Sequence, residues 1–220
     1  MARAAAGAMR SGALVAPLPG GRANDLVARL DIPADPVVAA SRLHLAQERP
    51  LDVGFVGGRA FLGVASVGFD SLANEAANET RWLVGPLVHA YGVARALLHD
   101  RSVHFHLEVD GQAQHFRGWN LIVGNSGRSG GSMNICPDAS LSDGLLDVLT
   151  IGEVPRRQFF TVLGRVFAGM HTTLPAITST TARHVRISAD QPLAVYADGN
   201  ILAHLPCDVT VRSGAVRVLA

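Results

Sequence analysis

Lysine is absent from this sequence of 220 residues, and all 19 basic side chains are arginines. There are 18 acidic side chains, so the formal net charge is only +1. A chain this close to neutral lacks the positive field that attracts nucleic acid or an anionic membrane. We therefore expect no nucleic-acid partner, and any phosphate contact would come from arginine, backbone N–H groups or a metal ion.

Cysteine and long apolar runs are also scarce. The two cysteines, Cys136 and Cys207, lack CxxC spacing, so we expect reduced, structural thiols in a cytosolic protein. No apolar run reaches the roughly 18 residues that a transmembrane helix needs. The first residues combine arginines with small apolar side chains, as a secretory signal does, but Pro17 and Pro19 break that segment. A cytoplasmic location is the prediction.

The hydrophobic pattern changes near residue 50. Before it, the pattern predicts helices over 1–12, 25–30 and 37–47 and a buried strand over 12–18. After it, strands dominate: two between 51 and 70 joined at Gly57-Gly58, two around Asp110-Gly111, one over 144–151, and four or five between 185 and 219. Helices are expected over 73–99 and 156–171. We predict an α+β protein, in which residues 1–49 are a remnant of an α/β domain and residues 50–220 form a β-rich, sandwich-like domain.

The segment "PLPGGRANDL", residues 17–26, holds the first candidate site. Gly20 and Gly21 allow the backbone to approach a ligand closely, and the N-terminus of the predicted helix that follows favours an anion. Asn24 or Asp25 would cap this helix. An ordinary N-capped turn without a ligand explains the same residues.

The second candidate is the loop "NSGRSGGSMNICPDASLSDGLLDV", residues 125–148. Its glycines permit close backbone approach, and Asp138, Asp143 and Asp147 follow within ten residues. Turns rich in oxygen ligands bind hard cations such as Mg²⁺. The aspartate spacing is not that of an EF-hand, and a solvated loop with turn-forming aspartates explains it equally well.

Two further candidates depend on single residue types. In "VYADGN", residues 195–200, Asp198 is a carboxylate at a strand end, which suits a proton acceptor, although Asp-Gly is also a common hairpin turn. His104 and His106 lie on one face of a predicted strand. A metal site there competes with a simple solvated face.

Four segments, in the same order, resemble the bacterial diacylglycerol kinase and lipid kinase family. "PLPGGRANDLVARLDIP" is similar to the family's P-x-G-T-x-N-D-F-A-R-x-L-G-I-P, and "RAFLGVASVGFDS" to F-x-N-x-x-S-x-G-F-D. The loop "NSGRSGGSMNICPDASLSDGLLDV" resembles N-x-x-x-x-G-G-G-M-x-I-A-P-x-A-x-x-D-D-G-x-L-D-V, and "YADGNILAHLP" resembles the D-G-E segment. The similarity runs from about Leu14 to the C-terminus.

The resemblance implies an enzyme that transfers the γ-phosphate of ATP to the hydroxyl of a diacylglycerol-like lipid at a membrane surface. Residues 1–49 would be the end of an ATP-binding domain, and residues 50–220 would cover the cleft and supply the base. Such chemistry needs mainly positioning and charge neutralisation, so carboxylates and Mg²⁺ are the expected components.

The resemblance also assigns roles to individual residues. Asp198 and Asn200 would match the catalytic D-G-E segment. Gly21, Asn24, Asp25 and Asp70 would lie around the nucleotide and its Mg²⁺. Asp143, with backbone oxygens of Ser140 and Leu145, would match a structural Mg²⁺ site beside the cleft.

Several positions depart from the family pattern. No G-G-D-G-T loop occurs in the 220 residues, Arg22 stands at the family's Thr, and Asn200 stands at the Glu of D-G-E. We expect the ATP-binding part upstream of Met1 or in another chain. The alternatives are a non-catalytic remnant that binds lipid or a partner, and a relative of the NAD kinases. Strand edges left uncovered would favour a homodimer.

Overall fold

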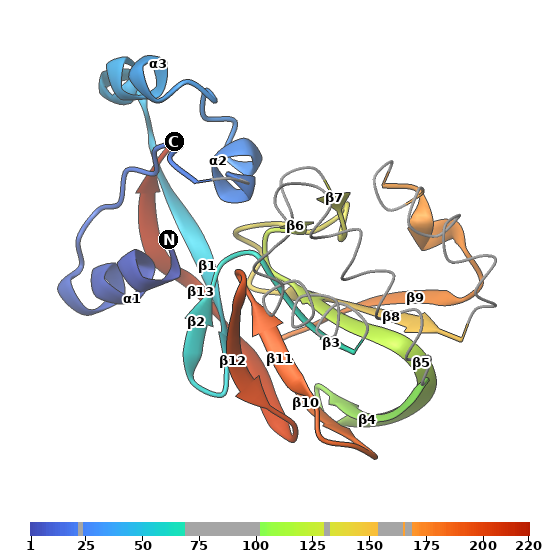
Figure 1. Ribbon diagram of the computed structural model, residues 1–220. Helices are drawn as coiled ribbons and strands as arrows, with labels where there is room; N and C mark the ends of the chain where they lie inside the picture. The colour runs from blue at the N-terminus through green and yellow to red at the C-terminus, as the bar shows by residue number, and fades with distance from the viewer. Residues whose placement is uncertain (22–23, 69–101, 130–132, 154–164, 166–168) are drawn as a thin grey trace, which may run out of the picture.

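A computed structural model describes residues 1–21, 24–68, 102–129, 133–153, 165 and 169–220 (Figure 1). The helical elements are α1 (Ala2–Ser11), α2 (Asp25–Arg29), α3 (Pro36–Ser41) and the 3-10 turns η1 (Leu43–Leu45) and η2 (His171–Thr173). The strands are β1 (Glu48–Val56), β2 (Arg59–Phe61), β3 (Val64–Gly68), β4 (Val103–Val109), β5 (Gln112–Gly124), β6 (Arg128–Ser129), β7 (Met133–Asn134), β8 (Leu146–Gly152), β9 (Ile177–Ala182), β10 (His184–Ala189), β11 (Ala194–Ala197), β12 (Asn200–His204) and β13 (Cys207–Leu219).

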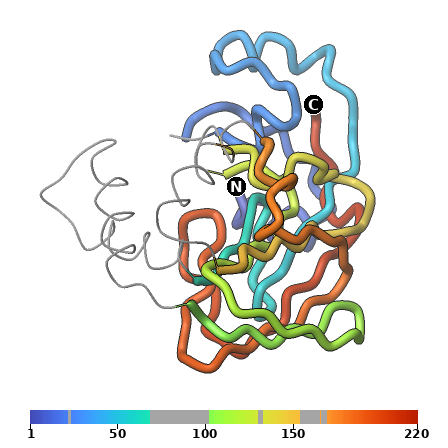
Figure 2. The backbone as a smooth tube through the Cα atoms, turned by 90° about the vertical axis from the view of Figure 1, so that its right-hand side faces the viewer, coloured from blue at the N-terminus to red at the C-terminus, as the bar shows by residue number. Residues whose placement is uncertain are grey.

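One large antiparallel sheet dominates the described part of the chain. Its strands follow the order β12-β11-β3-β5-β4-β10-β13-β1-β2. Off this path, β8 pairs with β5, and β9 pairs with β8. The branch arises because β5 is long: its first half pairs with β4, and its second half lies between β3 and β8. Figures 1 and 2 show α2 and α3 at one end of this sheet and the β4–β5 hairpin at the other.

Alternating burial and Asp-Gly turns explain the strands and hairpins that the sequence predicts. β4 buries every second residue, from Val103 to Val109, and exposes the residues between them. The Asp110-Gly111 and Asp198-Gly199 turns both have two positive φ angles, which is the conformation of a type I′ hairpin turn. These predictions are confirmed.

The region before β1 differs from the prediction in two places. Val15 forms a single parallel bridge with Val218 instead of a strand over 12–18, because Pro17 and Pro19 lack the N–H groups that would extend the pairing. The helix predicted over 37–47 ends at Ser41 and tightens into η1. The helix predicted over 73–99 and most of that over 156–171 lie outside the described residues.

The two predicted domains share a hydrophobic cluster. Ala5 and Ala8 of α1 and Leu26 of α2 pack with residues of β1 and β13, among them Val53 and Val218. β1 also begins at Glu48, so the strand crosses the boundary predicted at residues 49–50. The division into domains stays a prediction.

An arginine joins two edge strands of the sheet. Arg59 of β2 donates hydrogen bonds to the backbone carbonyls of Ile201 and Leu202 in β12, at 2.9 and 3.2 Å. Because β2 and β12 stand at opposite ends of the strand order, this contact brings the ends of the curled sheet together. The main core, which includes Phe61, Phe105 and Leu121, contains side chains from strands along this path.

Candidate functional site

Asp198 lies in the β11–β12 turn, and its carboxylate is held by backbone amides of the segment between β2 and β3. Leu62 N–H donates to Oδ2 at 2.9 Å, and Gly63 N–H donates to Oδ1 at 2.8 Å. Only glycine allows this approach, because a Cβ on residue 63 would lie 2.6 Å from Oδ1. The turn therefore presents a carboxylate in one defined orientation.

Burial of the Asp198 carboxylate raises its pKa above the ordinary value. The residue as a whole is exposed at the turn, while its carboxylate oxygens accept from two backbone amides. The amides of Leu62 and Gly63 and the amino group of Met1 lower the pKa, and the charge of Asp25 raises it. The fold thus brings Asp25, Asp198 and the start of α1 within electrostatic reach of one another.

Asn125, directly after β5, forms hydrogen bonds with the same Leu62–Gly63 segment. The carbonyl of Gly63 accepts hydrogen bonds from Asn125 N–H (2.9 Å) and Ser126 N–H (3.1 Å). The buried Asn125 amide donates to the carbonyls of Asp52 and Leu62. Sequence reasoning did not select Asn125, although a polar residue directly after the buried end of β5 is the pattern that marks it.

The "PGGRAND" turn is built differently from the prediction. Asn24 is the residue before α2, but its side chain makes no capping bond to the helix. Its Oδ1 instead accepts from Gly20 N–H (3.2 Å) and Gly21 N–H (2.9 Å), with Asn24 itself at a positive φ of 53°. The prediction that Asn24 caps the helix is wrong, because the amide closes the preceding turn. Arg22 and Asp70 lie outside the described residues.

The acidic loop, which carries Asp138, Asp143 and Asp147, is organised by a residue that the sequence analysis missed. Asp52, fully buried in β1, accepts from Gly144 N–H at 2.6 Å and from Gly214 N–H at 2.7 Å. Within the loop, Asp143 Oδ1 accepts from Leu145 N–H at 3.0 Å, and Ser140 Oγ accepts from Ser142 N–H at 3.3 Å. The structure therefore places Ser140, Asp143 and Leu145 in one braced turn.

Negative charge accumulates beside this turn. Burial raises the pKa of Asp147 to about 6, and Asp143 and Asp138 add to the effect, while Arg29 opposes it. Arg29, at the end of α2, also donates to the carbonyl of Ala139. Because Asp25 begins the same helix, α2 joins the Asp198 region to the acidic loop. Oxygen ligands with excess negative charge suit a hard cation.

No group of three or more His, Cys, Asp or Glu side chains in the described residues is arranged to hold a metal ion. A Mg²⁺ ion at the acidic loop would therefore take backbone and water oxygens as most of its ligands, which is usual for this ion. Asn200, the first residue of β12, uses its side-chain amide to donate to the carbonyl of Asp198 at 3.0 Å. It stabilises the turn and carries no charge.

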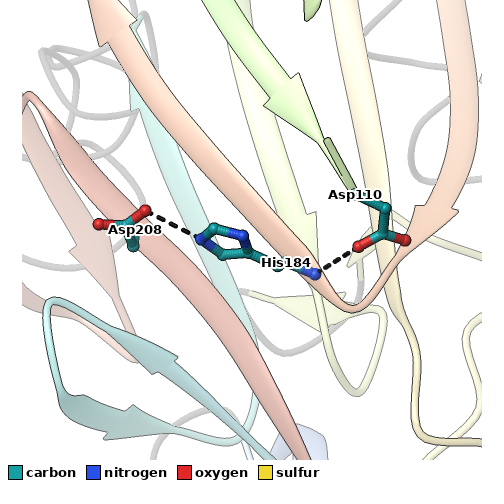
Figure 3. Close-up of polar contacts among 3 residues, drawn as sticks. All are labelled: Asp110, His184 and Asp208. Atoms are coloured by element: carbon teal, nitrogen blue, oxygen red, sulfur yellow. Dashed lines mark hydrogen bonds and ion pairs between the residues drawn. The ribbon is translucent and has the colours of Figure 1, made fainter. Parts of the chain in front are cut away.

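Figure 3 shows a carboxylate–histidine arrangement elsewhere on the sheet. His184 Nε2 contacts Asp208 Oδ1 at 2.9 Å, and the backbone N–H of His184 donates to Asp110 Oδ1 at 2.8 Å. His184 and Asp208 belong to the neighbouring strands β10 and β13, and Asp110 lies in the β4–β5 turn. Asp110 and Asp208 are exposed and His184 is half-buried, and these contacts connect β10 to its neighbours.

Comparisons with known proteins agree with this architecture. Residues 63–220 match the family model described as the YegS C-terminal NAD kinase beta sandwich-like domain. A diacylglycerol kinase of Mycobacterium tuberculosis (strain ATCC 25618 / H37Rv) is 31% identical over 209 residues, which cover 92% of this chain and 67% of that protein. This chain belongs to the bacterial diacylglycerol kinase and lipid kinase family. The diacylglycerol kinase of Bacillus subtilis (strain 168) is 25% identical over 86% of the chain.

A solved structure shares the fold of this chain. A diacylglycerol kinase of Bacillus anthracis str. Sterne superposes with a TM-score of 0.71 and 22% identity, over 92% of this chain and 67% of that one. The predicted family and the β-rich, sandwich-like fold are thus confirmed. The chain spans about two thirds of the length of these relatives.

In the described part of this lipid kinase family member, none of the helices has the length and apolar character needed to cross a membrane.

Proposed function

We propose that this chain is part of an ATP-dependent lipid kinase that phosphorylates a diacylglycerol-like hydroxyl. The observation that carries the proposal is the Asp198 carboxylate, held by two backbone amides at the end of β11 with a raised pKa. A carboxylate of raised basicity beside a second acidic residue suits proton acceptance in phosphoryl transfer.

In the proposed reaction Asp198 orients the lipid hydroxyl and accepts its proton. The hydroxyl oxygen then forms a bond to the γ-phosphorus of ATP, and the bond between that phosphorus and the β–γ bridging oxygen breaks to release ADP. The Leu62 and Gly63 amides keep the carboxylate oriented during this transfer. Asn200 cannot accept a proton at neutral pH, so its role is to hold the turn.

The proposed place for the ATP phosphates is the space between Asp25, Asp198 and the N-terminus of α1. The N-terminal end of α1 lies within electrostatic reach of the Asp198 carboxylate. The first N–H groups of a helix have no partner within the helix and favour anions. The G-G-D-G-T loop expected for this family would then belong to a part of the enzyme that these 220 residues do not contain.

Magnesium ions would have two places in this proposal. Asp25 and Asp70 would bind the nucleotide's Mg²⁺ together with water. Asp143, with the backbone oxygens of Ser140 and Leu145, would hold a structural ion that relieves the charge around Asp147. When bound, Mg²⁺ supplies charge neutralisation at the phosphates.

A lipid substrate implies work at a membrane surface, so we propose a cytoplasmic protein that binds there peripherally. We propose separately that it forms a homodimer. A second reading is a non-catalytic protein that binds lipid or a partner. Asn200 in place of an acidic residue and the lack of G-G-D-G-T in the 220 residues favour it. The name of the matched domain mentions NAD kinase, but the order of the four segments favours a lipid acceptor.

The test begins with the intact mass of the protein from its native cell, which defines the chain to be expressed. That chain is assayed with Mg·ATP and diacylglycerol in mixed micelles, and its Mg·ATP affinity is measured by calorimetry. We expect phosphorylation, with Asp198→Asn reducing kcat by about 10²- to 10⁴-fold. The exposed variant Asp208→Asn serves as the control and keeps the activity.

Two outcomes would reject the kinase proposal. Absence of Mg·ATP binding by the native-length chain would favour the non-catalytic reading. Full activity in Asp198→Asn would show that another group accepts the proton.

A further inference from the structure

His106 and His115 form a close pair on the exposed face of the β4–β5 hairpin. They are directly opposed in the register of the two strands. Their Nδ1 atoms lie 2.9 Å apart, and the ring centroids lie 4.9 Å apart with the rings near perpendicular, at 76°. The sequence analysis considered His104 as the partner of His106, but the fold brings His106 to His115.

The distance between these nitrogens matches a chelating pair. Two imidazole ligands at about 2.0–2.1 Å from a metal ion and at right angles to each other place their nitrogens about 2.9 Å apart. A tetrahedral ion requires a wider separation, about 3.4 Å, at the same bond lengths. Right-angled nitrogen ligands are typical of Cu²⁺ and Ni²⁺.

We propose that His106 and His115 form a surface chelate for a divalent transition metal ion, with Cu²⁺ preferred. Both nitrogens ligate when each ring carries its proton on Nε2, so binding replaces the present Nδ1···Nδ1 hydrogen bond. The described residues supply no third converging His, Cys, Asp or Glu, so water completes the coordination. This site is independent of phosphoryl transfer.

The surroundings of the pair permit a cation. On β4, His104 and Glu108 flank His106 on the same exposed face. On β5, Arg117 lies opposite His104, but its guanidinium is engaged by Glu153 at 2.9 Å and by Ser102. On β10, Ser188 lies beside His106. Arg186 lies opposite Glu108, and the negative charge of the glutamate offsets the positive charge of the arginine.

The test is titration of the native-length protein with CuCl₂, followed by calorimetry and electron paramagnetic resonance. We expect one saturable site per chain with nitrogen ligands, and an upward shift of Tm in the presence of Cu²⁺. His106→Gln and His115→Gln should each abolish this site. The matched control, His104→Gln, leaves it intact.

The outcomes separate this site from other copper ligands. Loss in both pair variants, with retention in His104→Gln and unchanged Tm of the metal-free variants, supports the chelate. Retention of stoichiometry and affinity in either pair variant overturns it. Loss of the site in His104→Gln also overturns it, because the metal would then depend on a different set of ligands.

Discussion

The backbone N–H of Gly63 donates to Asp198 Oδ1 at 2.8 Å, and the same oxygen occupies the space that a side chain on residue 63 would need. The carboxylate and the glycine therefore depend on each other. Both residues belong to segments that the sequence comparison selected, but the contact joins positions 135 residues apart.

Gly63→Ala should displace the Asp198 carboxylate, since the new Cβ would lie 2.6 Å from Oδ1. We expect a loss of about 1–3 kcal/mol in the free energy of unfolding, measured by urea denaturation. Gly7→Ala in α1 is the control, because no atom lies within 4 Å of its Cβ and alanine favours a helix. Equal stability of Gly63→Ala and the unchanged protein would contradict the contact.

Asp52→Ala should be among the most destabilising substitutions in the chain. It leaves the amides of Gly144 and Gly214 without their acceptor at a fully buried position. We expect a loss of about 2–5 kcal/mol, and a smaller loss for Asp52→Asn, which keeps one acceptor. Thermal and urea unfolding measure both.

The control for Asp52 is Asp208→Ala, which removes a surface contact with His184. It should cost less than about 1 kcal/mol. If Asp52→Ala cost no more than this control, the buried brace would not hold the acidic loop.

Arg59→Ala should increase self-association. Without the guanidinium, the carbonyls of Ile201 and Leu202 on the edge strand β12 lose a partner and become available to a second chain. Sedimentation velocity should show more dimer at the same concentration. Arg49→Ala, at another exposed arginine in β1, is the comparison, and equal association in both variants would refute the role of Arg59.

Cys136 and Cys207 should react slowly with a thiol reagent at pH 8. Burial raises the pKa of Cys207 to about 11, with Asp208 adding to the effect, and burial also raises that of Cys136. Both thiols are free, so unfolding in urea should release two reactive groups. Fast labelling of either thiol in the folded protein would be the contrary result.

The same shift predicts the pH dependence of stability. A raised thiol pKa means that the folded state holds its proton to higher pH than the unfolded chain. The associated stability is complete below the ordinary thiol pKa, about 8.5, and is lost as pH rises towards about 11. Cys207→Ala should weaken this decline, as denaturation at pH 8 and pH 10.5 would show.

Local patterns determined much of this protein. The alternation from Val103 to Val109 predicted the buried face of β4, and the pairs Asp110-Gly111 and Asp198-Gly199 predicted hairpin turns. The four family segments predicted the β-rich fold and the lipid kinase family, which the comparisons confirm. These features depend on neighbouring residues or on residue order, so the sequence alone carries them.

Tertiary structure decided which of these residues meet. Asp52 reaches amides 92 and 162 residues away, Arg59 reaches across the sheet ends, and His106 pairs with His115 instead of His104. Asn24 is a local exception: it closes its own turn with the N–H groups of Gly20 and Gly21, four and three residues away, a choice that the sequence left open. Residue spacing limits local conformation, but strand register and sheet curvature alone decide which distant side chain receives each hydrogen bond.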